Sequence, residues 1–311
     1  MEMRLKPFIT GAASFVFPGL LTTAHKAGSD NAEFCYSVFL RHYSYAAPYF
    51  GNPIPEIVAE LGPGSSLGVG LCALICGAKI YYALDVVDHT DPALNLRMFD
   101  DLVNLFRDRR PAPFGETIFP EPAALEFPAN LVMSSGDRLA AIRDDLVNRR
   151  NEFIRVTVPW TDVQIPGKTV GWLWSHSVME HVDDIERAWN CCATWLANDG
   201  VMTHNIDYQC HDLTKHWDGH RSINDLCWKI LRGRRPYLIN RMPHSAQMAL
   251  AKGNGFAVVS ELIHALDPDI PAGKLARCFA STTPSDRETA MAFVTLVANT
   301  PSIIGGPRCH G

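Results

Sequence analysis

A glycine-rich turn is the segment of this chain best suited to approach a ligand. The sequence Glu60-Leu-Gly-Pro-Gly-Ser-Ser-Leu-Gly68 directly follows a short apolar run. Glycine lets the backbone turn tightly and approach a ligand without a Cβ clash, and a helix that starts there presents N–H groups and the positive end of its dipole. The segment predicts a ligand-binding turn, although a tight turn without a ligand gives the same pattern.

An acidic residue stands where it would reach the ribose of an adenosine cofactor. Asp85 ends the next apolar run, about 20 residues after the turn. A carboxylate at that place accepts hydrogen bonds from both ribose hydroxyls, and the alternative is an aspartate that caps a loop. Because Glu60 lies at the end of the first run, it would repel a pyrophosphate but suit a ligand with an ammonium and a sulfonium. The charges therefore favour S-adenosylmethionine over a dinucleotide.

Histidines near the ends of two later apolar runs are candidates for proton transfer. They are His176, His181, His204 and His211. The pKa of imidazole suits this task near neutral pH, although His204 lies inside its run and is more typical of a packed core histidine. Asp207 precedes His211 by four residues, so in a helical turn the two would share one face.

We predict His211, oriented by Asp207, as a general base, with His181 as the second candidate. A divalent metal on the same group is the alternative, but the spacing matches no strong metal motif, so no metal site is predicted.

Alternating apolar runs predict the elements that position these residues. Strands are expected at 57–61, 79–84, 153–158, 170–174, 201–206, 256–262 and 291–297, with helices at 94–109, 137–149 and 184–197. The last helix should stop at Asn198-Asp-Gly200. The order indicates an α/β fold with a doubly wound, mostly parallel, Rossmann-like sheet. Ligands bind at the carboxyl ends of the strands of such sheets, which would bring the turn, Asp85 and the histidines together.

Additional segments should surround this sheet. We expect a helical N-terminal segment over 1–52 and a main domain over 53–311. Insertions at about 91–151 and 208–252 are predicted to form a substrate cap. Within the second insertion, an acceptor pocket could be lined by His216, Trp217, His220 and Trp228, although packing in a core is the commoner role of aromatic residues.

Two motifs together resemble a known superfamily. Glu60–Gly64 resembles the first motif of class I S-adenosylmethionine-dependent methyltransferases. Ser175-His-Ser-Val-Met-Glu-His-Val-Asp-Asp184 resembles the S-x-x-x-x-E-H-V-x-D segment after their fourth strand. The likeness covers about residues 56–207, with Asp85 between the motifs. More thinly, His204–Asp207, His211-Asp212 and Asn240-Arg241 resemble bacterial members, some of which act in glycan or secondary-metabolite pathways.

The resemblance implies a cofactor, a reaction and site residues. The cofactor-binding residues would be Glu60, Gly62, Pro63, Gly64, Ser66, Asp85, Asp162, Ser175 and His176. The reaction would be methyl transfer from S-adenosylmethionine to a small-molecule or glycan acceptor. If the methyl group goes to a hydroxyl, a base must take the proton of that hydroxyl, and we expect a histidine in this role. A non-catalytic S-adenosylmethionine-binding module is the alternative. An NAD-dependent oxidoreductase is disfavoured by Glu60 and the glycine spacing.

The composition of the chain bears on which classes of binding partner it could have. The 311 residues carry a formal net charge of −5 and are 47% hydrophobic, so the chain lacks a global basic field that would hold nucleic acid or an anionic membrane. The longest apolar run, 68–84, contains Lys79 and internal glycines, which is unlike a membrane span. A small-molecule partner fits this charge and hydrophobicity better. The sequence is also compatible with a homodimer.

Cysteine usage and the first residues bear on the compartment. Nine cysteines, an odd number without paired CxxC motifs, indicate reduced thiols rather than disulfides or zinc. Residues 1–24 superficially resemble a signal peptide, but Glu2, Pro7 and Pro18 interrupt them and no clean cleavage site follows. A cytoplasmic protein is therefore predicted.

Overall fold

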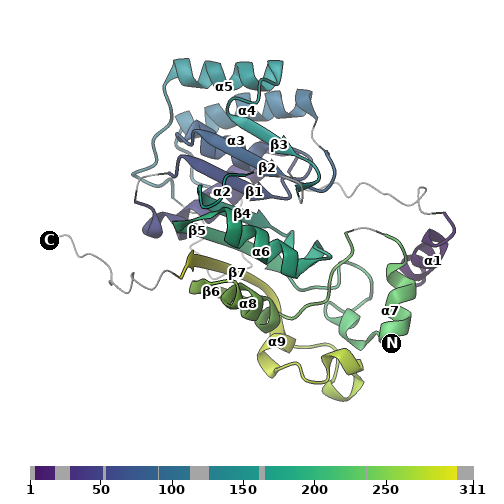
Figure 1. Cartoon of the computed structure of the whole chain (residues 1–311). Coiled ribbons are helices and arrows are strands. Elements are labelled where there is room, and N and C mark those ends of the chain that lie inside the picture. The colour runs from purple at the N-terminus through teal and green to yellow at the C-terminus, as the bar shows by residue number, and fades with distance from the viewer. Residues whose placement is uncertain are drawn as a thin grey trace.

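A seven-stranded sheet forms the centre of the protein (Figure 1). The structure, a computed structural model, describes residues 4–17, 29–51, 54–89, 91–112, 126–160, 165–235 and 237–299. The strands are β1 (Ile57–Leu61), β2 (Ile80–Leu84), β3 (Ile154–Thr157), β4 (Val170–His176), β5 (Leu196–Asp207), β6 (Phe256–Ala265) and β7 (Thr289–Ala298). Their order is β3-β2-β1-β4-β5-β7-β6, and β7 alone runs antiparallel to its neighbours β5 and β6. The predicted doubly wound, mostly parallel sheet is confirmed.

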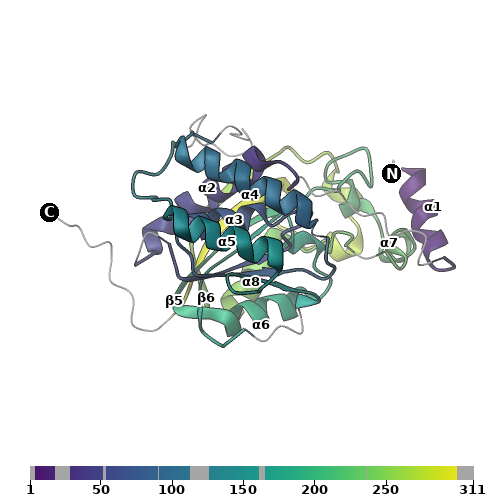
Figure 2. The same ribbon diagram turned by 90° about the horizontal axis from the view of Figure 1, so that it is seen from above.

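Helices cover both faces of this sheet. The α-helices of the described residues are α1 (Leu5–Ser14), α2 (Ala32–Ala46), α3 (Gly68–Ile75), α4 (Pro92–Arg107), α5 (Gly136–Asn148), α6 (Ile185–Trp195), α7 (Asp225–Arg232), α8 (His244–Gly253) and α9 (Pro284–Glu288). Figure 2 shows α2 and α4 on one side of the sheet and α6 and α8 on the other. Because side chains alternate along a strand, Trp172 and Trp174 enter the core under α2 and α3, while Leu173 enters the core under α6. Burial on both faces explains the nearly continuous apolar strands.

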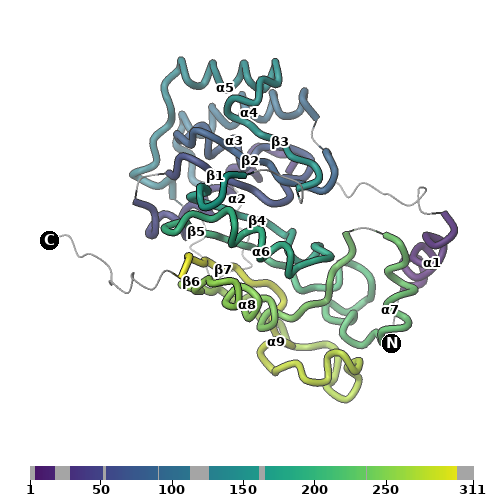
Figure 3. Tube along the Cα trace, in the orientation of Figure 1, coloured from purple at the N-terminus to yellow at the C-terminus, as the bar shows by residue number. Residues whose placement is uncertain are grey.

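The first two helices have different neighbours. α2 packs against α3, α4, β4 and β5, and buries residues such as Phe39 and Tyr43 in the core that holds Trp172. α1 instead packs against α7, away from the sheet, as the trace in Figure 3 shows. Gly11 makes this contact close, since a Cβ there would collide with the backbone of Ile230 and Leu231. The boundary predicted after residue 52 thus divides α2 from helices with which it shares a core.

The two predicted insertions lie in different places. In the first, α4 packs on α3 and α5 packs on α4, so the described part of 91–151 extends the helical layer on one sheet face. In the second, α8 packs on β6 and α6, while the described residues of 208–243 continue from the carboxyl end of β5 and include α7 and a 3₁₀ helix at Gly219–Ser222. Asn240 of this second segment contacts the loop after β4.

The end of α6 differs from the sequence prediction. The helix stops at Trp195, and Asn198-Asp-Gly200 belongs to β5, where Val170 of β4 pairs with Leu196 and Trp172 pairs with Val201. The extra residues form an irregularity in the strand rather than a helix stop. A Cβ on Gly200 would lie 2.9 Å from the carbonyl oxygen of Val170, so glycine permits the close backbone approach.

Two further expectations concern cysteines and membrane spans. The cysteines inside the described ranges all carry free thiols, and Cys309 lies outside them. In the same part of the chain, every helix is too short or too polar to cross a lipid bilayer.

Candidate active site

The glycine turn joins the end of β1 to α3. Gly62 and Gly64 have φ values of 67° and 75°, in the left-handed region that glycine adopts without strain. The Gly62 N–H donates to the carbonyl oxygen of Leu84 at the end of β2, at 2.8 Å. A Cβ on Gly62 would lie 2.5 Å from Cγ2 of Val178, which follows β4. The turn therefore contacts the loop after β4 closely, and position 62 has no room for a side chain.

The backbone amides at the start of α3 already have partners. The N–H groups of Ser65 and Ser66 donate to Oγ of Ser29 at 2.9 and 3.2 Å, and that of Leu67 donates to Oδ1 of Asn95 at 2.9 Å. These three amides belong to the turn that leads into α3, with Leu67 as the N-cap of the helix. Ser29 precedes α2 and Asn95 lies in α4, so residues distant in sequence close the site that a phosphate would use.

Asp85 lies beside the turn, at the carboxyl end of β2. Its Oδ1 accepts a hydrogen bond from the Val86 N–H at 2.7 Å. Burial raises the pKa of Asp85, and nearby N–H groups, including those of Val86 and Gly64, oppose that rise. Asp85 therefore caps its own loop and also approaches the glycine turn. Its position is compatible with both predicted roles, as a loop cap and as a ligand of the ribose. Asp162, the other predicted acid, lies outside the described residues.

Glu60 supports the turn from inside the core rather than from the open edge. Its side chain is 3% exposed, and its Oε2 accepts a hydrogen bond from the Tyr81 hydroxyl at 2.5 Å. Burial raises the pKa of Glu60 to about 7. Near neutral pH, Glu60 therefore carries less negative charge than an exposed glutamate, and it would repel a pyrophosphate less than its place in the sequence predicts.

This buried acid predicts a pH-dependent stability. Between the ordinary pKa of 4.5 and the folded value of about 7, the folded protein keeps a proton on Glu60 that the unfolded chain has released. The contribution of the protonated group is therefore fully present below pH 4.5 and lost as pH rises through 7. Relative to the parent, Glu60→Gln should gain up to about 3 kcal/mol of unfolding free energy between pH 4.5 and 8. Urea denaturation across this range measures it; identical pH slopes for both proteins would contradict it.

Ser175 and His176, at the end of β4, face opposite sides of the sheet. Ser175 Oγ lies 2.8 Å from Nδ1 of His204, which is buried against the ring of Trp189. His176 Nδ1 lies 3.3 Å from Nε2 of His42, a residue of α2 that carried no recognisable signal in the sequence. Burial lowers the pKa of both His176 and His204 to about 3. Both are therefore neutral at physiological pH, and His204 is the packed core histidine that its position suggested.

The structure brings His181, Asp207 and His211 together, as the sequence predicted. The rings of His181 and His211 are 4.8 Å apart and nearly perpendicular, and His211 Nε2 lies 3.5 Å from Asp207 Oδ2. The segment is not helical, however: His211 has a φ of 48° and Asp212 a φ of 63°. A left-handed turn after β5, rather than a helix face, thus brings His211 back toward Asp207.

Glu180, which belongs to the Ser175–Asp184 motif but is absent from the site residues that the sequence predicts, joins this group. It lies in the 3₁₀ helix Met179–His181 after β4 and is 2% exposed. Burial raises its pKa well above the ordinary value, and the charge of Asp207 adds to this. One ligand atom each from Glu180, His181 and His211 lie within 4.8 Å of one another.

Asn240 clamps the loop that carries Glu180 and His181. Its Nδ2 donates to the carbonyl oxygens of Met179 at 2.8 Å and Val182 at 3.1 Å, and its N–H donates to that of Glu180 at 2.6 Å. A small cavity of about 20 Å³ adjoins this clamp. Its wall includes Glu180, Asp207, His220, Arg221, Asn240 and Arg241.

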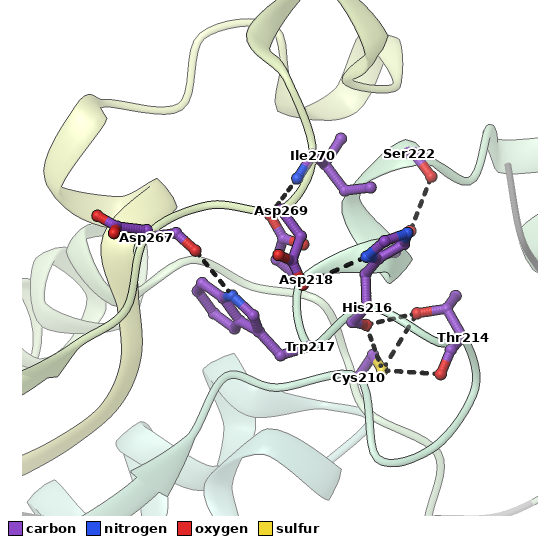
Figure 4. Close-up of polar contacts among 10 residues, drawn as sticks. Cys210, Thr214, His216, Trp217, Asp218, Ser222, Asp267, Asp269 and Ile270 are labelled. Atoms are coloured by element: carbon purple, nitrogen blue, oxygen red, sulfur yellow. Dashed lines mark hydrogen bonds and ion pairs between the residues drawn. The ribbon is translucent and has the colours of Figure 1, made fainter.

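Among the four residues predicted to line an acceptor pocket, His220 alone lies on this cavity. Figure 4 shows His216 facing Asp269, with Nδ1 3.3 Å from Oδ2, and Trp217 donating to the backbone oxygen of Asp267 at 3.1 Å. Trp228 lies under the Arg241 guanidinium, 4.3 Å from the ring centre. These three side chains hold the cap together.

Comparisons with known proteins give likeness only at the level of structure. No protein-family model and no curated protein sequence matches the chain. Geranyl diphosphate methyltransferase with geranyl diphosphate and sinefungin matches at 11% identity over 85% of this chain and 75% of its own, with a TM-score of 0.45. Geranyl diphosphate C-methyltransferase from Streptomyces coelicolor matches at 9% over 83% and 78%, with a TM-score of 0.43. An S-adenosylmethionine-dependent methyltransferase from Mesorhizobium loti matches at 11% over 86% and 99%, with a TM-score of 0.39. Because these TM-scores are all below 0.5, the three likenesses carry no argument about the activity of this chain.

Proposed function

We propose that this protein transfers a methyl group from S-adenosylmethionine to a hydroxyl of a small-molecule or glycan acceptor. One observation carries the proposal: the left-handed Gly62–Gly64 turn, Asp85 and the His181–Asp207–His211 group lie at the same edge of a doubly wound sheet. That edge is where such sheets bind ligands.

The residues around the turn fit an adenosine cofactor without a pyrophosphate. Asp85 is placed beside Gly64, where its carboxylate would accept the ribose hydroxyls. The amides of Ser65, Ser66 and Leu67, which a pyrophosphate would need, are bonded within the protein. This occupation supports S-adenosylmethionine over a nicotinamide dinucleotide. When bound, S-adenosylmethionine supplies a methyl group activated by the sulfonium.

The His181–Asp207–His211 group would act on the acceptor of the methyl group. A hydroxyl must lose its proton as its oxygen bonds to the methyl carbon, and we assign that proton to His211, oriented by Asp207 3.5 Å away. His176 and His204 are poor bases, because burial lowers their pKa to about 3. Residues 208–243 would cover the acceptor, since Asn240 and His220 of this segment border the site. The free thiols of the described residues suit a reducing, cytoplasmic compartment.

Replacement of Asp85 tests the cofactor assignment. We expect Asp85→Ala to weaken binding of S-adenosylhomocysteine by roughly 1–3 kcal/mol, about 5- to 150-fold, because hydrogen bonds to a charged partner are lost. Titration calorimetry measures this, with Asp88→Ala, an exposed acid in the same loop, as the matched control.

The same titrations separate the alternatives. Tight NAD binding by the parent, without heat from S-adenosylhomocysteine, would eliminate the methyltransferase proposal. Binding of S-adenosylhomocysteine by a protein that methylates none of a broad set of hydroxyl acceptors would favour a non-catalytic binding module instead.

A further inference from the structure

Glu180, His181 and His211 have the chemistry and the spacing of a metal-binding set. One ligand atom from each lies within 4.8 Å of the others, although the residues come from the loops after two different strands, β4 and β5. Two imidazoles and a carboxylate are donors that first-row divalent ions accept, both in zinc sites and in sites with open coordination positions. We propose that these three residues bind a divalent transition-metal ion, and that Mn²⁺ and Zn²⁺ are suitable probes of it.

The environment of Glu180 is the independent observation that points to a cation. The side chain is 2% exposed, and neither carboxylate oxygen accepts a hydrogen bond from a side chain of the described residues; the donors near it are the backbone N–H groups of Glu180 and Asp207. A buried carboxylate without a cation beside it is costly to keep ionised. A divalent ion would neutralise the carboxylates of Glu180 and Asp207 together, leaving the two imidazoles as neutral ligands.

The arginines on the neighbouring cavity do not supply that compensation. Arg221 donates to the backbone oxygens of Arg287 at 2.5 Å and Thr289 at 3.1 Å. Arg241 donates to the backbone oxygen of Ile223 and to Asp225. Both guanidinium groups thus have described partners other than Glu180.

The surrounding backbone holds the three ligands in place. Asn240 fixes the carbonyl groups of Met179, Glu180 and Val182, which sets the position of the loop that carries two of the ligands. Asp207 Oδ2, 3.5 Å from His211 Nε2, restrains the third. Such supporting contacts orient ligands and raise metal affinity.

A role of the metal site in the reaction rests on the proposed function, and it refines how the acceptor hydroxyl is activated. The His211 side chain is 31% exposed, so the ion would keep open positions toward the acceptor side. An acceptor hydroxyl bound there would lose its proton to water at a lower pH than a free hydroxyl does. His211 would then act as a ligand in the metal-loaded protein, and the ion would take over the activation that His211 provides as a base without it.

Metal titration of chelator-treated full-length protein tests the site directly. We expect one Mn²⁺ per chain, seen as loss of the free-ion electron paramagnetic resonance signal, with Zn²⁺ in competition. Glu180→Gln and His211→Asn should weaken Mn²⁺ binding about 10- to 100-fold or more. His216→Asn is the matched control, since His216 also faces an aspartate, Asp269, but lies outside the cluster. Mn²⁺ should also raise the thermal midpoint of the parent but not of Glu180→Gln, which reports the site without any activity assay.

The outcomes for the ion and for the cofactor are separable. Parent protein that binds S-adenosylhomocysteine but neither Mn²⁺ nor Zn²⁺, or cluster variants that bind Mn²⁺ as well as the parent, would overturn the metal site and leave the proposed function standing. Mn²⁺ binding that the cluster variants lose, in a protein that does not bind S-adenosylhomocysteine, would support the site and overturn the proposed function.

Discussion

His211→Ala should bind S-adenosylhomocysteine within a few-fold of the parent, yet lose roughly 100-fold or more of its turnover with a hydroxyl acceptor. The physical reason is the place of His211, beside Asp207 and His181. A group that takes the acceptor proton in the transition state contributes to turnover and little to the binding of the cofactor. Calorimetry and steady-state methyl transfer measure the two effects separately.

Two comparisons make this result specific to His211. His216→Ala removes a histidine paired with Asp269, and it should keep cofactor affinity and lose far less turnover than His211→Ala does. Full turnover in His211→Ala combined with loss in His181→Ala would move the catalytic function to the histidine after β4. Activity that disappears with a chelator and returns with a divalent ion would identify His211 as a ligand rather than a base.

Gly62→Val is expected to abolish measurable binding of S-adenosylhomocysteine. Gly62 has a φ of 67°, and the nearest atom to a Cβ there, Val178 Cγ2, would be only 2.5 Å away. A branched side chain must therefore shift the turn, the loop after β4, or both, and it would occupy space at the edge where the cofactor binds. Calorimetry on protein shown to be folded by near-ultraviolet circular dichroism measures the loss.

Gly77→Val separates backbone strain from loss of the site. Gly77 also has a left-handed φ, 110°, but lies after α3 at the opposite end of the strands, and a Cβ there would make an ordinary 3.7 Å contact with Ile54. Both variants should lose about 1–3 kcal/mol of stability from strain, while Gly77→Val keeps cofactor affinity. Normal binding by folded Gly62→Val would show that the turn is only structural. If Gly62→Val does not fold, Gly62→Ala in a Val178→Ala background, which removes both clashing methyl groups, carries the test.

Local sequence patterns were sufficient to predict the strands and their order along the chain. Strand and helix patterns depend on side chains two to four residues apart, so β1 was predicted at its observed bounds and the other six strands near theirs. The left-handed glycines and the place of Asp85 are also local properties of strand ends. Where a local signal failed, at Asn198-Asp-Gly200, pairing of β5 with β4 overrode a pattern that usually ends a helix.

Only the tertiary structure decided what the chemical groups contact. Ser29 and Asn95 occupy the amides of α3, Tyr81 binds Glu60 inside the core, and His42 of α2 meets His176. These partners are separated by 21 to 134 residues, so no local spacing could reveal them.

The clustering of Glu180 with His181 and His211 likewise arises because β4 and β5 are parallel neighbours whose ends meet at one edge. Spacing along the chain suggested which residues could do chemistry. The packing of distant segments sets the pKa of each group and determines which groups can act together. Desolvation and hydrogen bonding depend on the atoms within a few ångströms of a group, and these atoms often come from residues far away in the sequence.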